Sequence, residues 1–416
     1  MKKLSSLSGV CERPQVSRRA LLVSGGALFS WAYMPKFAHA AGGRDPRFVT
    51  IILRGALDGL SAVAPLGDPE YEKLHGVLAL SRSGDHPALP LDGFFGLNPS
   101  MPIFAKMFAD KQAAIVHAVA TGYRERSHFD GQDVLESGYP KAGNVDSGWL
   151  NRAIASLPRG ERVAASPNGL GIGPVTPLIL RGAAPVTGWA PSTLPPAGGD
   201  LAERLLELYG QRDPALQQAL SHGLGIEKIV ARDMAATPAG GRGNVAETMR
   251  QTARGAAKLL AAEDGPRIGA LAYDGWDTHA NEGGATGRLA QLLGGLDGAI
   301  DEFRQTLGAN WKDTIIAVVT EFGRTARING TIGTDHGTGT VAFLAGGALN
   351  GGRVIADWPG LQDAQLYENR DLRPTTDLRS VLKGLLADHL GLSGAVLAEK
   401  VFPETGHLQP LKGLVV

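Results

Sequence analysis

Cysteine is nearly absent from this sequence. Its 416 residues include one cysteine, Cys11, which falls in an N-terminal segment that we expect to be removed. The rest of the chain then has no disulfide, no thiolate metal ligand and no cysteine nucleophile. It also has no run of 18 or more uncharged apolar residues after position 40, so we predict no transmembrane segment in the mature chain.

The charge balance likewise has no excess of one sign. The chain has 41 Lys/Arg and 41 Asp/Glu, and residues 41–416 keep 35 basic and 40 acidic side chains. A nucleic-acid-binding protein presents a clustered basic excess, so we expect no nucleic-acid partner. Hydrophobic residues make up 43% of the chain, which is enough for a large buried core.

The first forty residues have the pattern of an export signal. Arg18 and Arg19 precede an apolar stretch that ends near Tyr33, and Ala38-His39-Ala40 offers a small-x-small cleavage site. This segment resembles a twin-arginine signal, which carries folded proteins across the bacterial inner membrane. An ordinary secretory signal with incidental arginines is the alternative. We therefore predict that residues 1–40 are removed, that the protein is periplasmic or secreted, and that the twin-arginine export machinery is a partner.

Apolar runs alternate with helical patterns along most of the remaining chain. Strands are predicted at 48–53, 113–119, 267–273, 314–320 and 341–345, and helices at 100–110, 287–307 and 376–390. Alternating strands and helices predict an α/β fold, with a mostly parallel sheet flanked by helices.

The stretch from about 146 to 266 has a different pattern. Helices are predicted at 149–157, 201–209, 215–234 and 245–262, separated by loops rich in proline and glycine, and short apolar pieces at 169–172 and 178–180 could be strands. We interpret this stretch as a helical, loop-rich insertion in a single domain that covers residues 41–416. An independent domain is the alternative.

Polar side chains follow several of the predicted strands. Ligands bind beyond the carboxyl ends of the strands in open parallel sheets, so these side chains could meet there. The candidates for metal binding are Asp58, Asp277, His279, Glu321, Asp335 and His336. Carboxylates together with imidazoles suit Zn, Mn or other divalent cations, and carboxylates alone favour Mg or Ca. We therefore expect one or two divalent metal ions of unknown identity.

Some of these candidates also have structural explanations. Asp58 in a Leu-Asp-Gly turn could bond to its own backbone. Glu321 could form an ion pair with Arg324 at the end of a strand. Asp277 and His279, an acid and an imidazole two residues apart in a polar loop, have little reason to exist in a packed core, which favours a functional interpretation. Asp335-His336, flanked by Thr334 and Gly337, is the strongest of the candidates.

A second group of candidates lies before the predicted helix that ends near Gly138. Ser127 could cap this helix, and the same position suits a nucleophile facing the helix N-terminus. Arg124, Arg126 and His128 beside it could hold a small anionic ester, because guanidinium groups pair with phosphate or sulfate. Solvated surface arginines are the alternative.

Five motifs in order resemble one exported bacterial family, the domain of unknown function 1501. The motifs are LRGALDGLSAVAP, RSHFDGQDVLESG, GWDTHAN, VVTEFGRTARING and GTDHGTGTVAFLAGG, and the resemblance covers nearly all of residues 41–416. The family is more remotely similar to the alkaline phosphatase/sulfatase superfamily. That resemblance implies an alkaline-phosphatase-like core and a metal-dependent hydrolase of phosphate or sulfate esters. The alternative is a non-catalytic periplasmic protein that keeps the fold and binds a metal or another ligand.

The superfamily resemblance also implies roles by chain order. By chain order, Asp58 resembles the superfamily's first metal ligand and Ser127 its nucleophile. Asp277 and His279 resemble its next pair of ligands, Glu321 its acid at a strand end, and His336 its last histidine. One departure is that the superfamily's Asp-His-Gly is here Glu321-Phe322-Gly323, which lacks an imidazole unless Asp335-His336 supplies it. The absence of a mature cysteine excludes a formylglycine sulfatase.

Overall fold

The computed structural model describes residues 44–143, 145–158, 169–173, 175–191, 199–214, 216–218, 220–221, 223–224 and 244–416. The predicted export signal at 1–40 and most of the predicted helix at 215–234 lie outside these residues. Among the described residues, no helix has the length and apolar character needed to cross a membrane.

The centre of the fold is a nine-stranded sheet in the order β11-β5-β10-β9-β1-β8-β6-β7, with β12 paired to β5. Its strands are β1 (Arg47–Arg54), β5 (Ala113–Ala120), β6 (Gly169–Ile172), β7 (Val186–Trp189), β8 (Ile268–Asp274), β9 (Thr314–Thr320), β10 (Thr340–Ala345), β11 (Arg353–Ile355) and β12 (Thr376–Asp377). Only β10 runs antiparallel to its neighbours, β5 and β9. The predicted mostly parallel sheet is confirmed.

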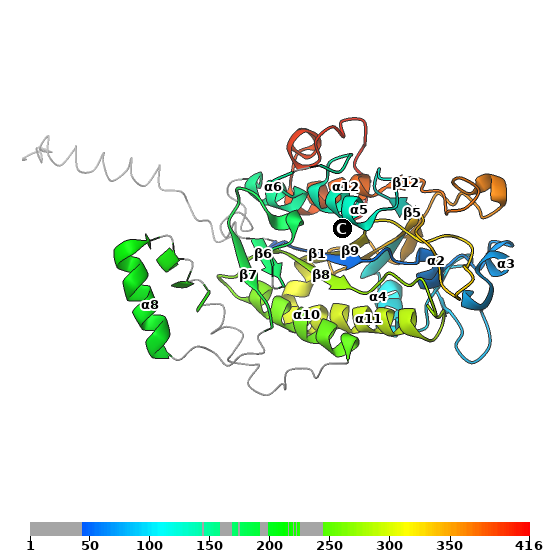
Figure 1. Ribbon diagram of the computed structural model, residues 1–416, viewed down its shortest axis with the longest axis horizontal. Helices are drawn as coiled ribbons and strands as arrows, with labels where there is room; N and C mark the ends of the chain where they lie inside the picture. The colour runs from blue at the N-terminus through cyan, green and yellow to red at the C-terminus, as the bar shows by residue number, and fades with distance from the viewer. Residues whose placement is uncertain are drawn as a thin grey trace, which may run out of the picture. The chain divides into compact units, whose positions relative to one another are not determined.

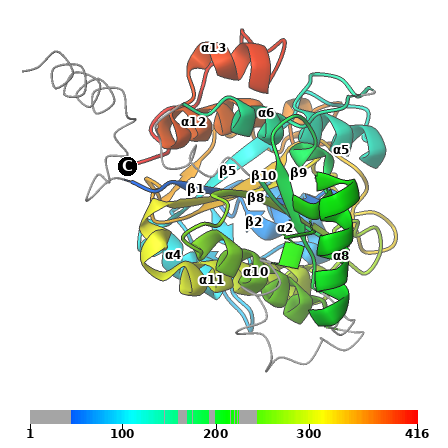
Figure 2. The same cartoon turned by 90° about the vertical axis from the view of Figure 1, so that its left-hand side faces the viewer.

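Helices cover both faces of this sheet (Figures 1 and 2). One face carries α4 (Pro102–Ala109), α10 (Val245–Ala261) and α11 (Arg288–Leu307), and the other carries α5 (His128–Ser137), α6 (Trp149–Ala155) and α12 (Leu378–Leu390). The other elements are the helix α8 (Gly199–Arg212), the short helices α2 (Gly59–Ala62), α3 (Tyr71–His75) and α13 (Gly394–Val396), and a three-stranded sheet of β2 (Val63–Ala64), β3 (Leu89–Pro90) and β4 (Gly96–Leu97).

Strand β1 shows why the sheet is covered on both sides. Successive side chains of a strand point to opposite faces. Val49, Ile51 and Leu53 belong to the hydrophobic cluster that includes α10 and α11, whereas Phe48 and Ile52 belong to the cluster that includes α6 and α12. A strand buried on both faces has a continuous apolar sequence, which is the pattern seen here.

Several elements of the stretch 146–266, which we interpreted as a helical, loop-rich insertion, join the central sheet and the helices that cover it. Strand β6 pairs in parallel with β8 and extends the sheet, and α10 packs along α11. The apolar piece Leu178–Leu180 forms a 3₁₀ turn instead of a strand. Ile179 and Leu180 are buried there. A short apolar run in a sequence indicates that its residues are buried, but it does not distinguish a strand from a helical turn.

The direction of the strands decides where their loops meet. Strands β1, β5, β8 and β9 all run the same way, so their carboxyl ends lie along one edge of the sheet. Strand β10 runs the opposite way and therefore begins at that edge. The loops after β1, β5, β8 and β9 and the residues before β10 meet there.

A buried ion pair anchors the loop after β1. Asp58 is the N-cap of α2, and its carboxylate accepts a hydrogen bond from the backbone N–H of Leu60. The other carboxylate oxygen lies 3.1 Å from His75 Nε2, which also lies 2.7 Å from Ser61 Oγ. Burial alone would raise the pKa of Asp58, but His75 and the hydrogen bonds lower it to about 2.

Replacing Asp58 by alanine should lower the free energy of unfolding by about 3–5 kcal/mol at pH 7, because His75 would be buried without its carboxylate. The pKa of Asp58 is about 2 in the fold against an ordinary 3.8. Its contribution is therefore present above about pH 4 and is lost as the pH falls toward 2, so the variant should lack this acid slope. Urea unfolding from pH 2 to 7 measures both effects.

The matched control is Asp85→Ala, which removes an exposed carboxylate. If both variants lost the same stability at pH 7, the structural role assigned to the Asp58–His75 pair would be wrong.

Candidate metal site at the carboxyl edge of the sheet

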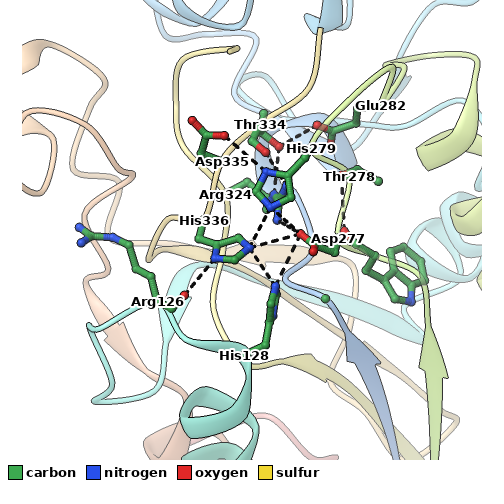
Figure 3. A network of polar contacts seen from close by, with 12 residues as sticks. Arg126, His128, Asp277, Thr278, His279, Glu282, Arg324, Thr334, Asp335 and His336 are labelled. Carbon is green, nitrogen blue, oxygen red and sulfur yellow. Dashed lines mark hydrogen bonds and ion pairs between the residues drawn. The ribbon is translucent and has the colours of Figure 1, made fainter. Parts of the chain in front are cut away.

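Four side chains from three loops point toward one another at this edge (Figure 3). His128 is the first residue of α5 and follows the loop after β5. Asp277 and His279 lie in the loop after β8, and His336 lies four residues before β10. Residues that are as much as 208 positions apart in the chain therefore share one site.

Backbone contacts hold the chain that carries His336. Between β9 and β10, the N–H of Gly323 donates to Thr338 O, the N–H of Gly337 donates to Gly323 O, and the N–H of Thr325 donates to Asp335 O. A Cβ atom at Gly337 would lie 2.3 Å from Arg324 O, so only glycine allows this close approach. These contacts hold the two segments side by side in antiparallel direction, so the backbone of His336 lies opposite that of Arg324.

The converging atoms are separated by distances that suit metal ligands. His336 Nε2 lies 2.9 Å from His128 Nε2 and 3.0 Å from His279 Nε2. Asp277 Oδ1 lies 3.0 Å from His279 Nε2, 3.3 Å from His336 Nε2 and 3.6 Å from His128 Nε2. Ligand atoms about 2.0–2.1 Å from a tetrahedral zinc ion are about 3.3 Å apart. The group His128, Asp277 and His336 forms a triangle of this size, and His279 extends it.

Each imidazole is anchored through its other nitrogen. His128 Nδ1 lies 2.8 Å from Glu321 Oε1, His336 Nδ1 lies 3.0 Å from the carbonyl oxygen of Arg126, and His279 Nδ1 lies 3.4 Å from Asp335 Oδ1. Since these oxygens accept hydrogen bonds, each Nδ1 carries the proton, and a neutral ring then presents a lone pair on Nε2. Three lone pairs therefore face one small volume. They repel one another unless a proton or a metal ion lies among them.

Glu321 supports His128 from the buried side. Its side chain is fully buried, and Oε1 also accepts hydrogen bonds from the N–H of Gly55 and from Gln132 Nε2. Burial alone would raise the pKa of Glu321, but the hydrogen bonds, first that of His128, hold it below its ordinary value. Phe322 stacks against the His128 ring with centroids 5.0 Å apart. The acid and the aromatic ring together fix the direction of His128 Nε2.

Arg324 supports Asp277 in the same way. Its buried guanidinium donates from Nη1 to Asp277 Oδ1 at 2.6 Å. Partial burial alone would raise the pKa of Asp277, but the hydrogen bond and the charge of Arg324 hold it below its ordinary value. Asp277 is therefore ionised, as a metal ligand must be.

The site is open to solvent on one side. The side chains of Asp277 and His279 are 42% and 46% exposed, whereas those of Glu321 and Arg324 are 0% exposed. A buried support with an exposed ligand face is the arrangement that leaves a coordination position for a substrate.

The structure distributes the predicted site residues over several roles. It brings Asp277, His279 and His336 together, with Glu321 and Asp335 behind the imidazoles. Asp58 is not in this group: its carboxylate contacts His75 and the first turn of α2.

The residues before α5 also differ from expectation. Ser127 is the N-cap of α5, but its side chain makes no capping hydrogen bond. Arg124 Nη1 donates to the carbonyl oxygens of Thr121 and Tyr123. The guanidinium of Arg126 pairs with Asp371 and Glu368. Both guanidinium groups therefore contact acceptors of the protein itself, and binding of an anion by Arg124 or Arg126 stays a prediction.

Sequence reasoning missed two members of the site. His128 was expected to hold a substrate anion, and its position as the fourth converging side chain was not predicted. A histidine at the start of a helix that follows a strand was the available signal. An ion pair of Arg324 with Glu321 was one alternative from the sequence, but Arg324 pairs with Asp277. The spacing of residues along the chain does not decide between these two partners.

Comparison with known proteins gives one family. The family described as "Protein of unknown function (DUF1501)" matches residues 45–401. No curated protein matches the chain.

Several solved structures are similar to this chain. Ps i-CgsB in complex with k-i-k-neocarrahexaose shares 10% identity at a TM-score of 0.40, with 88% of this chain and 74% of that chain covered. A phosphonate monoester hydrolase of Agrobacterium radiobacter shares 12% identity at a TM-score of 0.33, covering 83% and 74%. A TAB5 alkaline phosphatase mutant with bound Mg shares 12% at 0.33, covering 73% and 92%. The likeness to each of these structures is remote.

Proposed function

This chain belongs to the DUF1501 family, and we propose that it is an exported, divalent-metal-dependent hydrolase of phosphate or sulfate esters. The observation that carries the proposal is the convergence of three imidazole Nε2 atoms on the carboxylate of Asp277, with neighbouring atoms 2.9–3.6 Å apart. Neither packing nor solvation favours such an arrangement, because it places the lone pairs of neighbouring imidazole nitrogens in contact and they repel one another.

The donor set indicates which ions fit. Imidazole nitrogen with one carboxylate suits Zn, Mn and related transition metals, whereas Mg and Ca prefer oxygen ligands. We therefore propose that His128, Asp277 and His336 hold the ion, with His279 as an additional ligand or a ligand to a second ion. When bound, such an ion supplies Lewis acidity that stabilises negative charge on ester oxygens.

The protein's own groups favour an anionic substrate at the same place. Helix α5 begins at His128, and the N–H groups of its first turn, with the positive end of the helix dipole, favour a negative ligand. Ser127 precedes this turn and its hydroxyl does not cap the helix. We propose that Ser127 is the nucleophile, or that it orients the ester beside the ligands.

Purified mature protein should carry one or two divalent ions per chain, measured by plasma mass spectrometry. His336→Ala and Asp277→Ala should each lose most of this metal because each removes a converging ligand. His86→Ala, which changes an exposed histidine elsewhere, should keep it. Folded wild-type protein that takes up no divalent metal would contradict the proposal.

A panel of aryl phosphate, phosphodiester and aryl sulfate substrates should identify a hydrolysed class. Asp277→Ala should lower kcat/KM by about 100-fold or more, since loss of groups that only support ligands already costs about 10–100-fold. Ser127→Ala should lower kcat with little change in KM if Ser127 attacks, and exposed Ser83→Ala is its control. Bound metal without cleavage of any ester would favour the non-catalytic binding protein.

Export is the remaining part of the proposal. Changing Arg18 and Arg19 together to lysine should move the protein from the periplasmic to the cytoplasmic fraction, since paired arginines define the twin-arginine signal. Arg13→Lys should leave export unchanged. If the double variant were exported as well as the wild type, the segment would instead be an ordinary secretory signal.

A further inference from the structure

A chain of hydrogen bonds runs from Asp277 into the interior of the protein (Figure 3). Asp277 Oδ1 accepts from Arg324 Nη1 at 2.6 Å. Arg324 Nε then donates to Thr334 Oγ1 at 3.1 Å, and Arg324 Nη2 donates to the carbonyl oxygen of the same threonine. Thr334 Oγ1 donates to Glu282 Oε2 at 2.7 Å. Glu282 is fully buried and ends the chain.

The direction of each hydrogen bond in this chain is determined. Guanidinium nitrogens only donate, so Thr334 Oγ1 must accept from Arg324, and its single proton is then directed to Glu282. Two contacts to one threonine hold the guanidinium plane, and this plane sets where Nη1 meets Asp277. Without Glu282, the Thr334 hydroxyl could rotate away from this position.

The surroundings of Glu282 favour its neutral form. Among the described residues, its Oε1 is buried with no hydrogen-bond partner. Burial, together with the negative charge of Asp58, raises the pKa of Glu282 to about 9. A neutral Glu282 accepts the hydrogen bond from Thr334 but has no negative charge that would compete with Asp277 for the guanidinium of Arg324. The electrostatic attraction between Arg324 and the candidate ligand Asp277 is therefore not weakened by Glu282.

We propose that Glu282 is a positioning residue: acting through Thr334 and Arg324, it orients the carboxylate of Asp277 for metal binding. This inference rests on the proposed metal site. It assigns a role to an acid that none of the site's ligands contacts, and it extends the support of the site beyond the groups that touch the imidazoles. The chemical requirement at position 282 is a neutral hydrogen-bond acceptor of the length of Glu.

The test compares four variants of the mature protein by titration with Zn²⁺ after metal removal. Glu282→Ala and Thr334→Val should each weaken Zn²⁺ binding by about 10-fold or more, the usual effect of removing a group that orients a ligand. Glu282→Gln should bind within about 3-fold of the wild type, because its amide oxygen accepts from Thr334 as the neutral acid does. Thr50→Val is the matched control, since Thr50 is also a buried threonine but its hydroxyl has no hydrogen-bond partner among the described residues.

A cobalt spectrum separates positioning from general stability. Co²⁺-loaded Glu282→Ala should show changed visible absorption bands, because a shifted Asp277 alters the ligand field, and Glu282→Gln should restore the wild-type bands. If Glu282→Ala loses stability but keeps the wild-type Zn²⁺ affinity and spectrum, Glu282 is structural only and the inference is wrong. If Glu282→Gln binds as weakly as Glu282→Ala, the neutral-acid role is wrong. Failure of the wild type to bind Zn²⁺ or Co²⁺ would instead contradict the proposed function.

Discussion

Mutual repulsion among imidazole lone pairs is the physical constraint on which the site depends. Once Glu321 and the carbonyl oxygen of Arg126 have fixed the protons of His128 and His336 on Nδ1, the two Nε2 atoms face each other at 2.9 Å. In the protein without a metal, a proton can occupy this space. In agreement, the hydrogen bond to Glu321 raises the pKa of His128, and burial followed by the charge of His128 lowers the pKa of His336. A divalent ion would satisfy all the lone pairs together.

In the rest of the site, the supporting groups are buried and the candidate ligands are partly exposed to solvent. The groups that orient the ligands, among them Glu321, Arg324 and Glu282, are buried at the strand ends and beneath the loops. The ligands themselves are partly open to solvent. Rigid placement of exposed ligands by buried neighbours reduces the reorganisation needed when an ion or a substrate binds.

Phe322, the residue after the strand-end acid Glu321, is part of the support of the site. Its aromatic ring stacks on the imidazole of His128, which comes from α5. The three imidazoles of the candidate site thus come from three different parts of the chain, and the ring of Phe322 packs against one of them.

The sequence by itself was sufficient for the strands β1, β5, β8, β9 and β10, because buried strands have continuous apolar runs. It also predicted that polar side chains beyond the strand ends could meet, and the structure brings Asp277, His279 and His336 together. Only the tertiary structure decided that Asp58 pairs with His75, that Arg324 pairs with Asp277 and that His128 joins the cluster. Which partner a polar side chain meets depends on distances between loops far apart in the chain. Local patterns of hydrophobicity carry no information about those distances.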